Sequence, residues 1–466
     1  MFSDKQNSKL NTYSYEDKAQ DNRLLMTETP VPRLILKLSC STVISMLAGT
    51  VYNLADMYFV SGVSNSAVAA VGIMFSVLSM IQAAGYTFGM GAGSRISRLL
   101  GKNENEKADL CATLAFVLSV ISGLILMTVG FIWERPLVHF LGGTDTISDY
   151  AMEYGMFILI TAPVMCGAYV LNNVLRSEGM PVWALAGIGT GCILNIILDP
   201  VFISLLNMGI RGAGLATLIG QTAGFVIMFS VLKSKKSVVN LKFTKKYLKD
   251  ALPEIKTIIK TGSPSFFRQG LVCMATIMIN RAAAAYGDDT VAAISVANKV
   301  FAIIFAAAVG YGQGFSPVAG FNFGAKKYDR VKKSVKFAVV SETAAVAVIG
   351  LFMWIFAEQI MEIFGGNEQV GLGVMALRSH AVSLPFMSLS LITGMLFQAT
   401  GKIKQAVLVS SARQGIFFLP LIWLLPAFFN ETGIAFTQGI SDILAGLFSM
   451  PFLILWCKKY ENFEKH

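Results

Sequence analysis

The stretch VYNLADMYFV (51–60) places one carboxylate, Asp56, inside a long apolar run. A second stretch, ILNIILDPVFI (193–203), places Asn195 and Asp199 inside another apolar run. A charged side chain at membrane depth costs several kcal/mol, so such residues are rarely accidental. Asn195 and Asp199 are four residues apart and therefore share one face of a helix. The two stretches predict a buried site for a cation or a proton inside a membrane protein.

The composition is that of a polytopic membrane protein. Of the 466 residues, 54% are hydrophobic and only 14% are charged, whereas soluble domains carry roughly 25% charged residues. We attribute the net charge of +10 to basic cytoplasmic loops, and we do not expect the protein to bind nucleic acid. The six cysteines show no paired spacing, so neither a disulfide framework nor a zinc site is expected.

Twelve apolar runs are long enough to span a bilayer as helices, which takes about 20 residues each. The predicted spans are 34–61, 66–97, 108–132, 149–175, 181–205, 210–232, 253–285, 290–321, 333–357, 371–399, 403–427 and 432–457. Basic residues gather in alternate loops and near both ends of the chain. Because basic loops stay on the cytoplasmic side, we expect both termini in the cytoplasm.

The second half of the chain repeats the first at an offset of about 223 residues. FGMGAGSRISRLLGK (88–102) matches YGQGFSPVAGFNFGAK (311–326), and FLGGTD (140–145) matches IFGGNE (363–368). Each repeat contains six spans, so both copies enter the membrane from the same side. The sequence therefore predicts an all-α fold of two parallel six-helix lobes, related by a pseudo-twofold axis along the membrane normal, around a central cavity.

The repeat and the charge pattern also predict a division of the chain. The expected parts are a cytoplasmic N-terminal arm (1–32), a first lobe (33–232), a basic cytoplasmic linker (233–252), a second lobe (253–457) and a cytoplasmic tail (458–466). Because the arm is polar and mixed in charge, we expect it to be disordered or to lie on the cytoplasmic surface.

Helix depth predicts that the polar residues of the first lobe meet. At ~1.5 Å of rise per residue, Asp56 and Asp199 both lie in the outer half of the membrane. Thr217 and Tyr154 reach a similar level, and Tyr52 lies one turn before Asp56. Hard cations prefer oxygen ligands such as these, which favours a site for Na⁺ or H⁺. The alternative is a purely structural pair of hydrogen-bonded carboxylates.

The second lobe lacks this pattern, because the repeat places Ile279 at the position of Asp56. Its polar residues in or near spans are instead Arg268, Gln269, Arg281, Glu342, Arg413 and Asp442. For each of them, pairing with a neighbouring helix is the expected role.

Three motifs resemble the MATE family of multidrug and toxic compound extrusion transporters over almost the whole chain. They are the Asn-x-x-x-Asp-Pro element (195–200), GAGLAT (212–217) and the basic LLGK turn (99–102). The resemblance is to the DinF-like branch, because RQGLVCMATIMIN (268–280) lacks the acidic residue that NorM-type members use in span seven. It implies a first-lobe cation site at Asp56, Asn195, Asp199 and Thr217, supported by Tyr52, Tyr154 and Asn172.

By this resemblance the protein is a multi-pass antiporter of the cytoplasmic membrane and not an enzyme. It would be a monomer that expels amphipathic, often cationic compounds in exchange for Na⁺ or H⁺ by alternating access, with no other cofactor. Gln269, Arg268 and Arg413 are candidates for lining the drug cavity.

The alternative function is that of a flippase for lipids or lipid-linked oligosaccharides, whose pyrophosphate would need an arginine cluster such as Arg268, Arg281 and Arg413. A receptor or scaffold fits buried carboxylates poorly.

Overall fold

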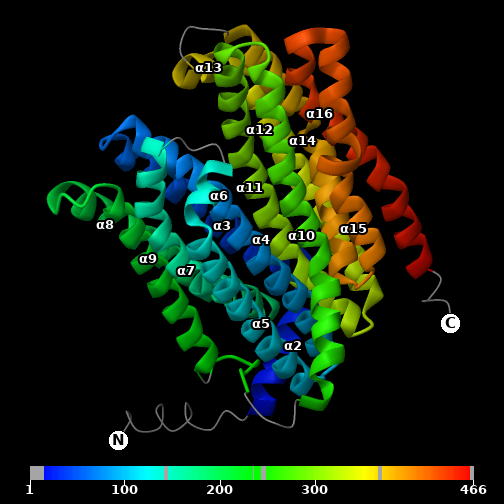
Figure 1. Ribbon diagram of the computed structural model, residues 1–466. Helices are drawn as coiled ribbons and strands as arrows, with labels where there is room; N and C mark the ends of the chain where they lie inside the picture. The colour runs from blue at the N-terminus through cyan, green and yellow to red at the C-terminus, as the bar shows by residue number, and fades with distance from the viewer. Residues whose placement is uncertain (1–14, 141–144, 235, 243–247, 366–369, 462–466) are drawn as a thin grey trace, which may run out of the picture.

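The computed structural model describes residues 15–140, 145–234, 236–242, 248–365 and 370–461. These residues form helices joined by short connections and contain no strand (Figure 1). The helices of the first lobe are α3 (Val31–Ser61), α4 (Asn65–Gly101), α5 (Asn105–Ile132), α7 (Asp145–Ser177), α8 (Pro181–Pro200) with the π-helical turn η1 (Val201–Leu205), and α9 (Ile210–Lys233).

The second lobe has the same order of long helices. They are α10 (Leu248–Ala284), α11 (Asp288–Gly324), α12 (Tyr328–Ile355), α14 (Val370–Ala399), α15 (Ile403–Ser411) with the π-helical segment η3 (Ala412–Phe417), and α16 (Phe418–Glu461). Three shorter helices accompany them: α2 (Tyr15–Glu28), α6 (Glu134–Phe140) and α13 (Ala357–Gly365).

The number of spans agrees with the sequence. Ten helices in the described part of the chain are long and apolar enough to cross a membrane. One of these, Ile403–Tyr460, holds two spans, because Asn430 has a non-helical backbone (φ 53°, ψ −139°) that divides α16. The more polar α10 completes the twelve predicted spans. The all-α, two-lobe fold is therefore confirmed.

The internal repeat is visible in the backbone. Asn207 and Asn430 both adopt a left-handed backbone, with φ of 51° and 53°, and so do Asn103 and Lys326, with φ of 62° and 59°. Non-glycine residues seldom adopt this conformation. Each pair is separated by the predicted offset of about 223 residues, so corresponding turns of the two lobes share one conformation.

The two lobes meet closely near the ends of α4 and α11 that carry the basic loops. A Cβ atom on Gly91 would lie 2.5 Å from the Ile258 carbonyl oxygen of α10, and one on Gly314 would lie 2.4 Å from the Ser39 backbone of α3. Gly324 likewise lies against the Arg98 backbone. The glycine runs of both lobes thus allow close helix packing. In Figure 1 the two lobes diverge from this contact toward α6 and α13.

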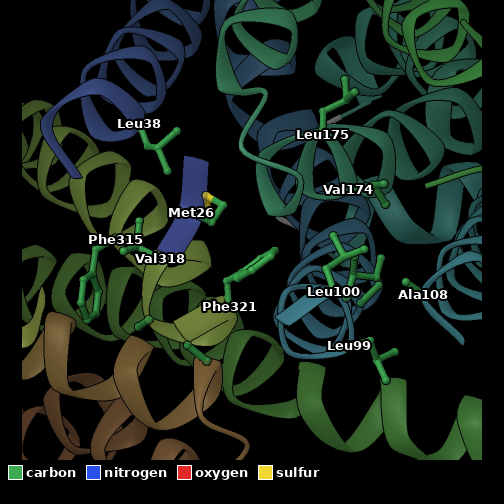
Figure 2. Packing of buried hydrophobic residues seen from close by; sticks show 14 of the residues in the cluster. Met26, Leu38, Leu99, Leu100, Ala108, Val174, Leu175, Phe315, Val318 and Phe321 are labelled. Atoms are coloured by element: carbon green, nitrogen blue, oxygen red, sulfur yellow. The ribbon is translucent and has the colours of Figure 1, made fainter. Parts of the chain in front are cut away.

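An apolar core joins the lobes at the same end. Its members come from α2, from every long helix of the first lobe and from every long helix of the second lobe. Figure 2 shows Met26 of α2 among these side chains, with Phe321 and Val318 of α11 nearby. Residues 15–28 of the predicted arm are therefore a helix with a buried side chain, which the polar sequence did not indicate.

The close lobe contact predicts a difference between two glycines of α10. A Cβ atom on Gly262 would collide with the backbone of Thr87 in α4, whereas one on Gly270 meets nothing within 4 Å. Gly262→Ala should therefore lower the free energy of unfolding by ~1–3 kcal/mol through overpacking. Gly270→Ala should be neutral or stabilise by up to ~1 kcal/mol, because alanine favours helix. Thermal unfolding in detergent measures both, and equal effects would contradict this packing.

Candidate functional site

Asp56 of α3 is buried in the first lobe and receives one hydrogen bond. The Tyr154 hydroxyl of α7 donates to Asp56 Oδ2 at 2.9 Å, and both side chains are buried. Asp56 Oδ1 has no hydrogen-bond partner among the described residues. A buried polar atom without a partner is rare in proteins. Asp56 therefore retains the capacity to bind another ligand.

Asn195 of α8 lies between Asp199 of the same helix and Thr217 of α9. In the amide orientation that satisfies both neighbours, its nitrogen donates to Asp199 Oδ2 at 3.2 Å. Its oxygen then accepts from Thr217 Oγ1 at 3.3 Å and from the Thr217 backbone nitrogen at 3.2 Å. The Tyr52 hydroxyl of α3 lies 3.4 Å from Thr217 Oγ1 and links α3 to this group. All four side chains are buried.

Small residues bring α8 and α9 close enough for this contact. A Cβ atom on Gly220 would lie 2.6 Å from the Gly191 carbonyl oxygen and 3.4 Å from the Asn195 Cβ atom. A larger residue at either glycine would separate the two helices and pull Asn195 away from Thr217. The GAGLAT motif and the glycines around it thus place the threonine against the asparagine.

The polar cluster of Tyr52, Asp56, Tyr154, Asn195, Asp199 and Thr217 contains two acids and no base. Among the described residues, neither Asp56 nor Asp199 forms an ion pair, although they lie close enough for their charges to interact. Two nearby carboxylates cannot both ionise cheaply. A bound cation or a proton would relieve this repulsion. The donor set is oxygen-rich, as hard cations prefer, and the described chain holds no group of three or more His, Cys, Asp or Glu residues suited to a metal.

A cavity adjoins this cluster, and it is larger than the small second-lobe pocket described below. It measures about 220 Å³ and is lined mainly by first-lobe helices, with Ala306 of α11 contributing from the second lobe. Tyr52 belongs to both the cluster and the cavity wall. Asn172 also lines the cavity, but its amide nitrogen approaches the Ala184 carbonyl oxygen at 3.4 Å and none of the carboxylates.

Arg413 and Asp442 form a buried ion pair in the second lobe. Arg413 Nε lies 2.5 Å from Asp442 Oδ1, and the Gln438 amide donates to the same oxygen at 2.9 Å. The guanidinium also stacks over the Phe305 ring, 4.3 Å from its centre. The predicted pairing of these two residues with neighbouring helices is confirmed. Asp442 neutralises Arg413, so this arginine is less suited to binding an anionic substrate.

The other predicted drug-cavity residues lie apart from the larger cavity. Arg268 and Arg413 line a small pocket of about 20 Å³ in the second lobe. The polar neighbour of Arg268 is Met90 Sδ, at 3.4 Å across the lobe interface. Gln269 lines neither of these cavities. The larger cavity therefore borders the predicted cation site at Tyr52, and none of these three residues is among its lining residues.

Polar contacts that sequence reasoning missed join the lobes near the basic loops. Arg95 of α4 forms a two-point ion pair with Glu254 of α10, at 3.1 and 3.3 Å. Arg98 donates to the Ala399 carbonyl oxygen at the end of α14, at 2.6 Å. Arg176 of α7 pairs with Gln313 of α11. From the sequence these arginines were assigned to the basic cytoplasmic loops, and nothing in it indicated their partners in the other lobe.

Two six-helix lobes of membrane-spanning length, with a buried polar cluster and an adjoining cavity in the first of them, define a polytopic membrane transporter. The MatE family model matches residues 42–201 and 264–424, one copy in each lobe. The chain belongs to this family of MATE transporters. The DinF-like branch stays a prediction.

Relatives with similar sequences cover nearly the full chain. The multidrug export protein MepA of Staphylococcus haemolyticus is 26% identical over 91% of this chain and 93% of its own length. MepA of Staphylococcus aureus is 26% identical over 94% and 96%. A solved structure of a MATE family multidrug resistance transporter, in its outward-facing conformation, superposes with a TM-score of 0.86 at 24% identity, covering 94% of this chain and 98% of that one. At this identity the superposition supports the fold alone.

The surroundings of the two acids predict that matched substitutions will lower stability by very different amounts. Asp442→Asn leaves the buried Arg413 without its counter-charge and should cost ~3–5 kcal/mol of stability. Asp56→Asn removes no ion pair and keeps an acceptor for Tyr154, so it should cost less than ~1 kcal/mol. Thermal unfolding of the purified variants in one detergent compares them. A large loss of stability in Asp56→Asn would show that this carboxylate is structural.

Proposed function

We propose that the protein is a cation-coupled multidrug efflux antiporter of the cytoplasmic membrane. The observation that supports this proposal most is the pair Asp56 and Asp199, buried among neutral donors without an ion-pair partner in the described chain. The names of its MepA relatives, which are multidrug export proteins, support the drug-efflux part of the proposal.

In the proposed mechanism the cluster binds either Na⁺ or a proton and releases it during the transport cycle. With Na⁺ bound, the oxygens of Asp56, Asp199 and Thr217 share the ion. With a proton bound, one carboxyl group becomes neutral, and the cost of holding two like charges together disappears. The Tyr154 hydroxyl stabilises the ionised form of Asp56, because a donated hydrogen bond favours the charge.

The drug would bind in the cavity beside the cluster. The cavity wall includes three methionines and several aromatic rings: Met46, Met165, Met228, Tyr86, Tyr169 and Phe225. Methionine adapts to varied apolar shapes, which suits recognition of many compounds. Because Tyr52 faces both the cavity and Thr217, a drug that displaces it disturbs the cluster. The cation and the drug would thus favour different arrangements, which coupling requires.

Alternating access is proposed from the position of the lobe contacts. The contacts of Arg95, Arg98 and Arg176 lie near the basic loops, which the charge rule places in the cytoplasm together with both termini. This arrangement corresponds to a conformation closed on the cytoplasmic side. Transport would require these contacts to separate while the opposite ends of the lobes approach. The proposed units are the lobes 33–232 and 253–457, joined by the linker 233–252.

The flippase alternative receives less support. A pyrophosphate cargo needs several arginines that face one cavity. Arg413 is already neutralised by Asp442, and Arg281 is exposed at the far end of α10. Arg268 alone remains for such a cargo.

Conservative replacement of the cluster acids tests cation coupling. Asp56→Asn and Asp199→Asn remove the exchangeable charge and should abolish drug efflux from proteoliposomes driven by a Na⁺ gradient or by a pH gradient, each imposed separately. Asp288→Asn, an exposed acid at the start of α11, is the matched control and should transport normally. Efflux at the wild-type rate in both cluster variants would contradict the proposal.

A reversible crosslink tests whether the cytoplasmic contact opens. A Cβ atom on Gly320 of α11 would lie 3.1 Å from the Ser97 Cβ atom of α4, and a disulfide needs only a slightly longer separation of ~3.5–4.5 Å. Oxidation of the double variant Ser97→Cys, Gly320→Cys should stop efflux, and dithiothreitol should restore it. The two single variants control for the six native cysteines. Full efflux by completely crosslinked protein would show that the contact need not open.

A further inference from the structure

Glu342 lies near the middle of α12 and has no assigned role in the proposed cation site. Its side chain is 2% exposed, and neither carboxylate oxygen has a hydrogen-bond partner among the described residues. The Ser388 hydroxyl of α14 lies beside it but is within hydrogen-bond distance of Thr343 Oγ1, at 3.3 Å. The sequence predicted that Glu342 pairs with a neighbouring helix; in the described structure its polar neighbour there is the Ser388 hydroxyl, and no base forms an ion pair with it.

The internal repeat shows that packing does not demand an acid at this position. α5 (105–132) and α12 (328–355) have the same length and begin 223 residues apart, so Glu342 corresponds to Ser119. Ser119 is buried and bonds to the Phe116 carbonyl oxygen of its own helix at 2.8 Å. A serine thus fills the equivalent place in the first lobe, and the glutamate is an addition particular to the second.

A short chain of contacts links Glu342 to the lobe interface. The neighbouring Ser341 hydroxyl lies 2.6 Å from the Tyr311 hydroxyl of α11. The backbone carbonyl of Tyr311 accepts a hydrogen bond from the Ser39 hydroxyl of α3, at 3.0 Å, in the first lobe. Tyr311 and Gly310 are therefore part of the contact that must separate when the lobes move.

Few charged groups can influence Glu342. Among the helices packed against α12, α11 brings the titratable side chain of Tyr311 close enough to Glu342 for their charges to interact. The other titratable and charged groups of those helices are Arg33, Lys37, Cys40, Tyr52, Asp56 and Tyr58 of α3, Asp288, Asp289 and Lys299 of α11, Glu358 and Glu362 of α13, and Arg378 and His380 of α14. None of these is paired with Glu342.

We propose that Glu342 is a proton-binding site of the second lobe, which holds a proton while the lobes are closed at Tyr311 and releases it to water when they separate. An unpaired buried carboxylate is far more costly than the neutral acid, so closure favours the bound proton. Opening of the contact between α3 and α11 admits water to the acid and allows it to ionise. This inference rests on the alternating access proposed above, but it requires no cation at Asp56 or Asp199.

Infrared difference spectroscopy on the full-length protein tests the protonation state directly. A protonated carboxylic acid has a carbonyl stretching band that shifts on exchange into D₂O, whereas a carboxylate has none in that region. We expect such a band at neutral pH in the wild type and its loss in Glu342→Gln. Glu362→Gln, an exposed acid of α13, is the matched control and should leave the band unchanged. A spectrum of Glu342→Gln identical to the wild type overturns the proposal.

Transport measurements then test whether this proton is coupled. Glu342→Gln mimics the protonated acid permanently, so efflux driven by a pH gradient should fall at least tenfold, and Glu342→Asp should recover part of it. Efflux driven by a Na⁺ gradient should persist, because Asp56 and Asp199 are intact. Unchanged pH-driven efflux in a folded Glu342→Gln variant overturns the proposal, as does a Na⁺ dependence of the infrared band, which would indicate a Na⁺ ligand instead.

The two proposals fail in different ways. Loss of all efflux in Asp56→Asn together with normal efflux in Glu342→Gln would support the first-lobe site and overturn the role of Glu342. The reverse pattern would support Glu342 and contradict the first-lobe cation site.

Discussion

The cost of burying two acids without a base is the constraint on which the rest of the structure depends. Asp56 and Asp199 lie inside the first lobe among the hydroxyls of Tyr154 and Thr217 and the amide of Asn195. Neutral donors reduce this cost but do not cancel it, which is why we propose that a cation or a proton completes the site. The close approach of α8 and α9 at Gly191 and Gly220 serves the same end by holding the donors in place.

The buried charges of the second lobe are arranged differently from those of the first. Arg413 and Asp442 cancel each other in a buried ion pair, and Arg413 lines the small pocket. Glu342 is left without a base and lies next to the helix that contacts the first lobe. The repeat has therefore produced two lobes of one fold with different electrostatics, and the unbalanced acids lie where the proposed transport cycle would change their access to water.

Helix depth made much of the first-lobe site predictable. A uniform rise per residue places Asp56, Asp199 and Thr217 at one level from sequence alone, and the structure brings their side chains together. The pairing of Arg95 with Glu254 and the lack of a base beside Glu342 were not predictable, because both depend on how each helix is rotated and on which helix faces it. The same limit explains why Gln269 was named for a cavity that instead adjoins Tyr52. The helix α2 was not predicted because its sequence is polar and lacks the apolar run by which the other helices were recognised.

Displacement of the coupling ion by drug is the most direct measurement of the central claim. Purified protein in weakly buffered detergent is loaded with radioactive Na⁺ and titrated with a cationic drug, while released protons and released Na⁺ are both recorded. The account predicts that drug binding displaces Na⁺ or H⁺ from the wild type and that Asp56→Asn binds the drug without this displacement. Saturating drug binding to the wild type with release of neither ion would contradict it.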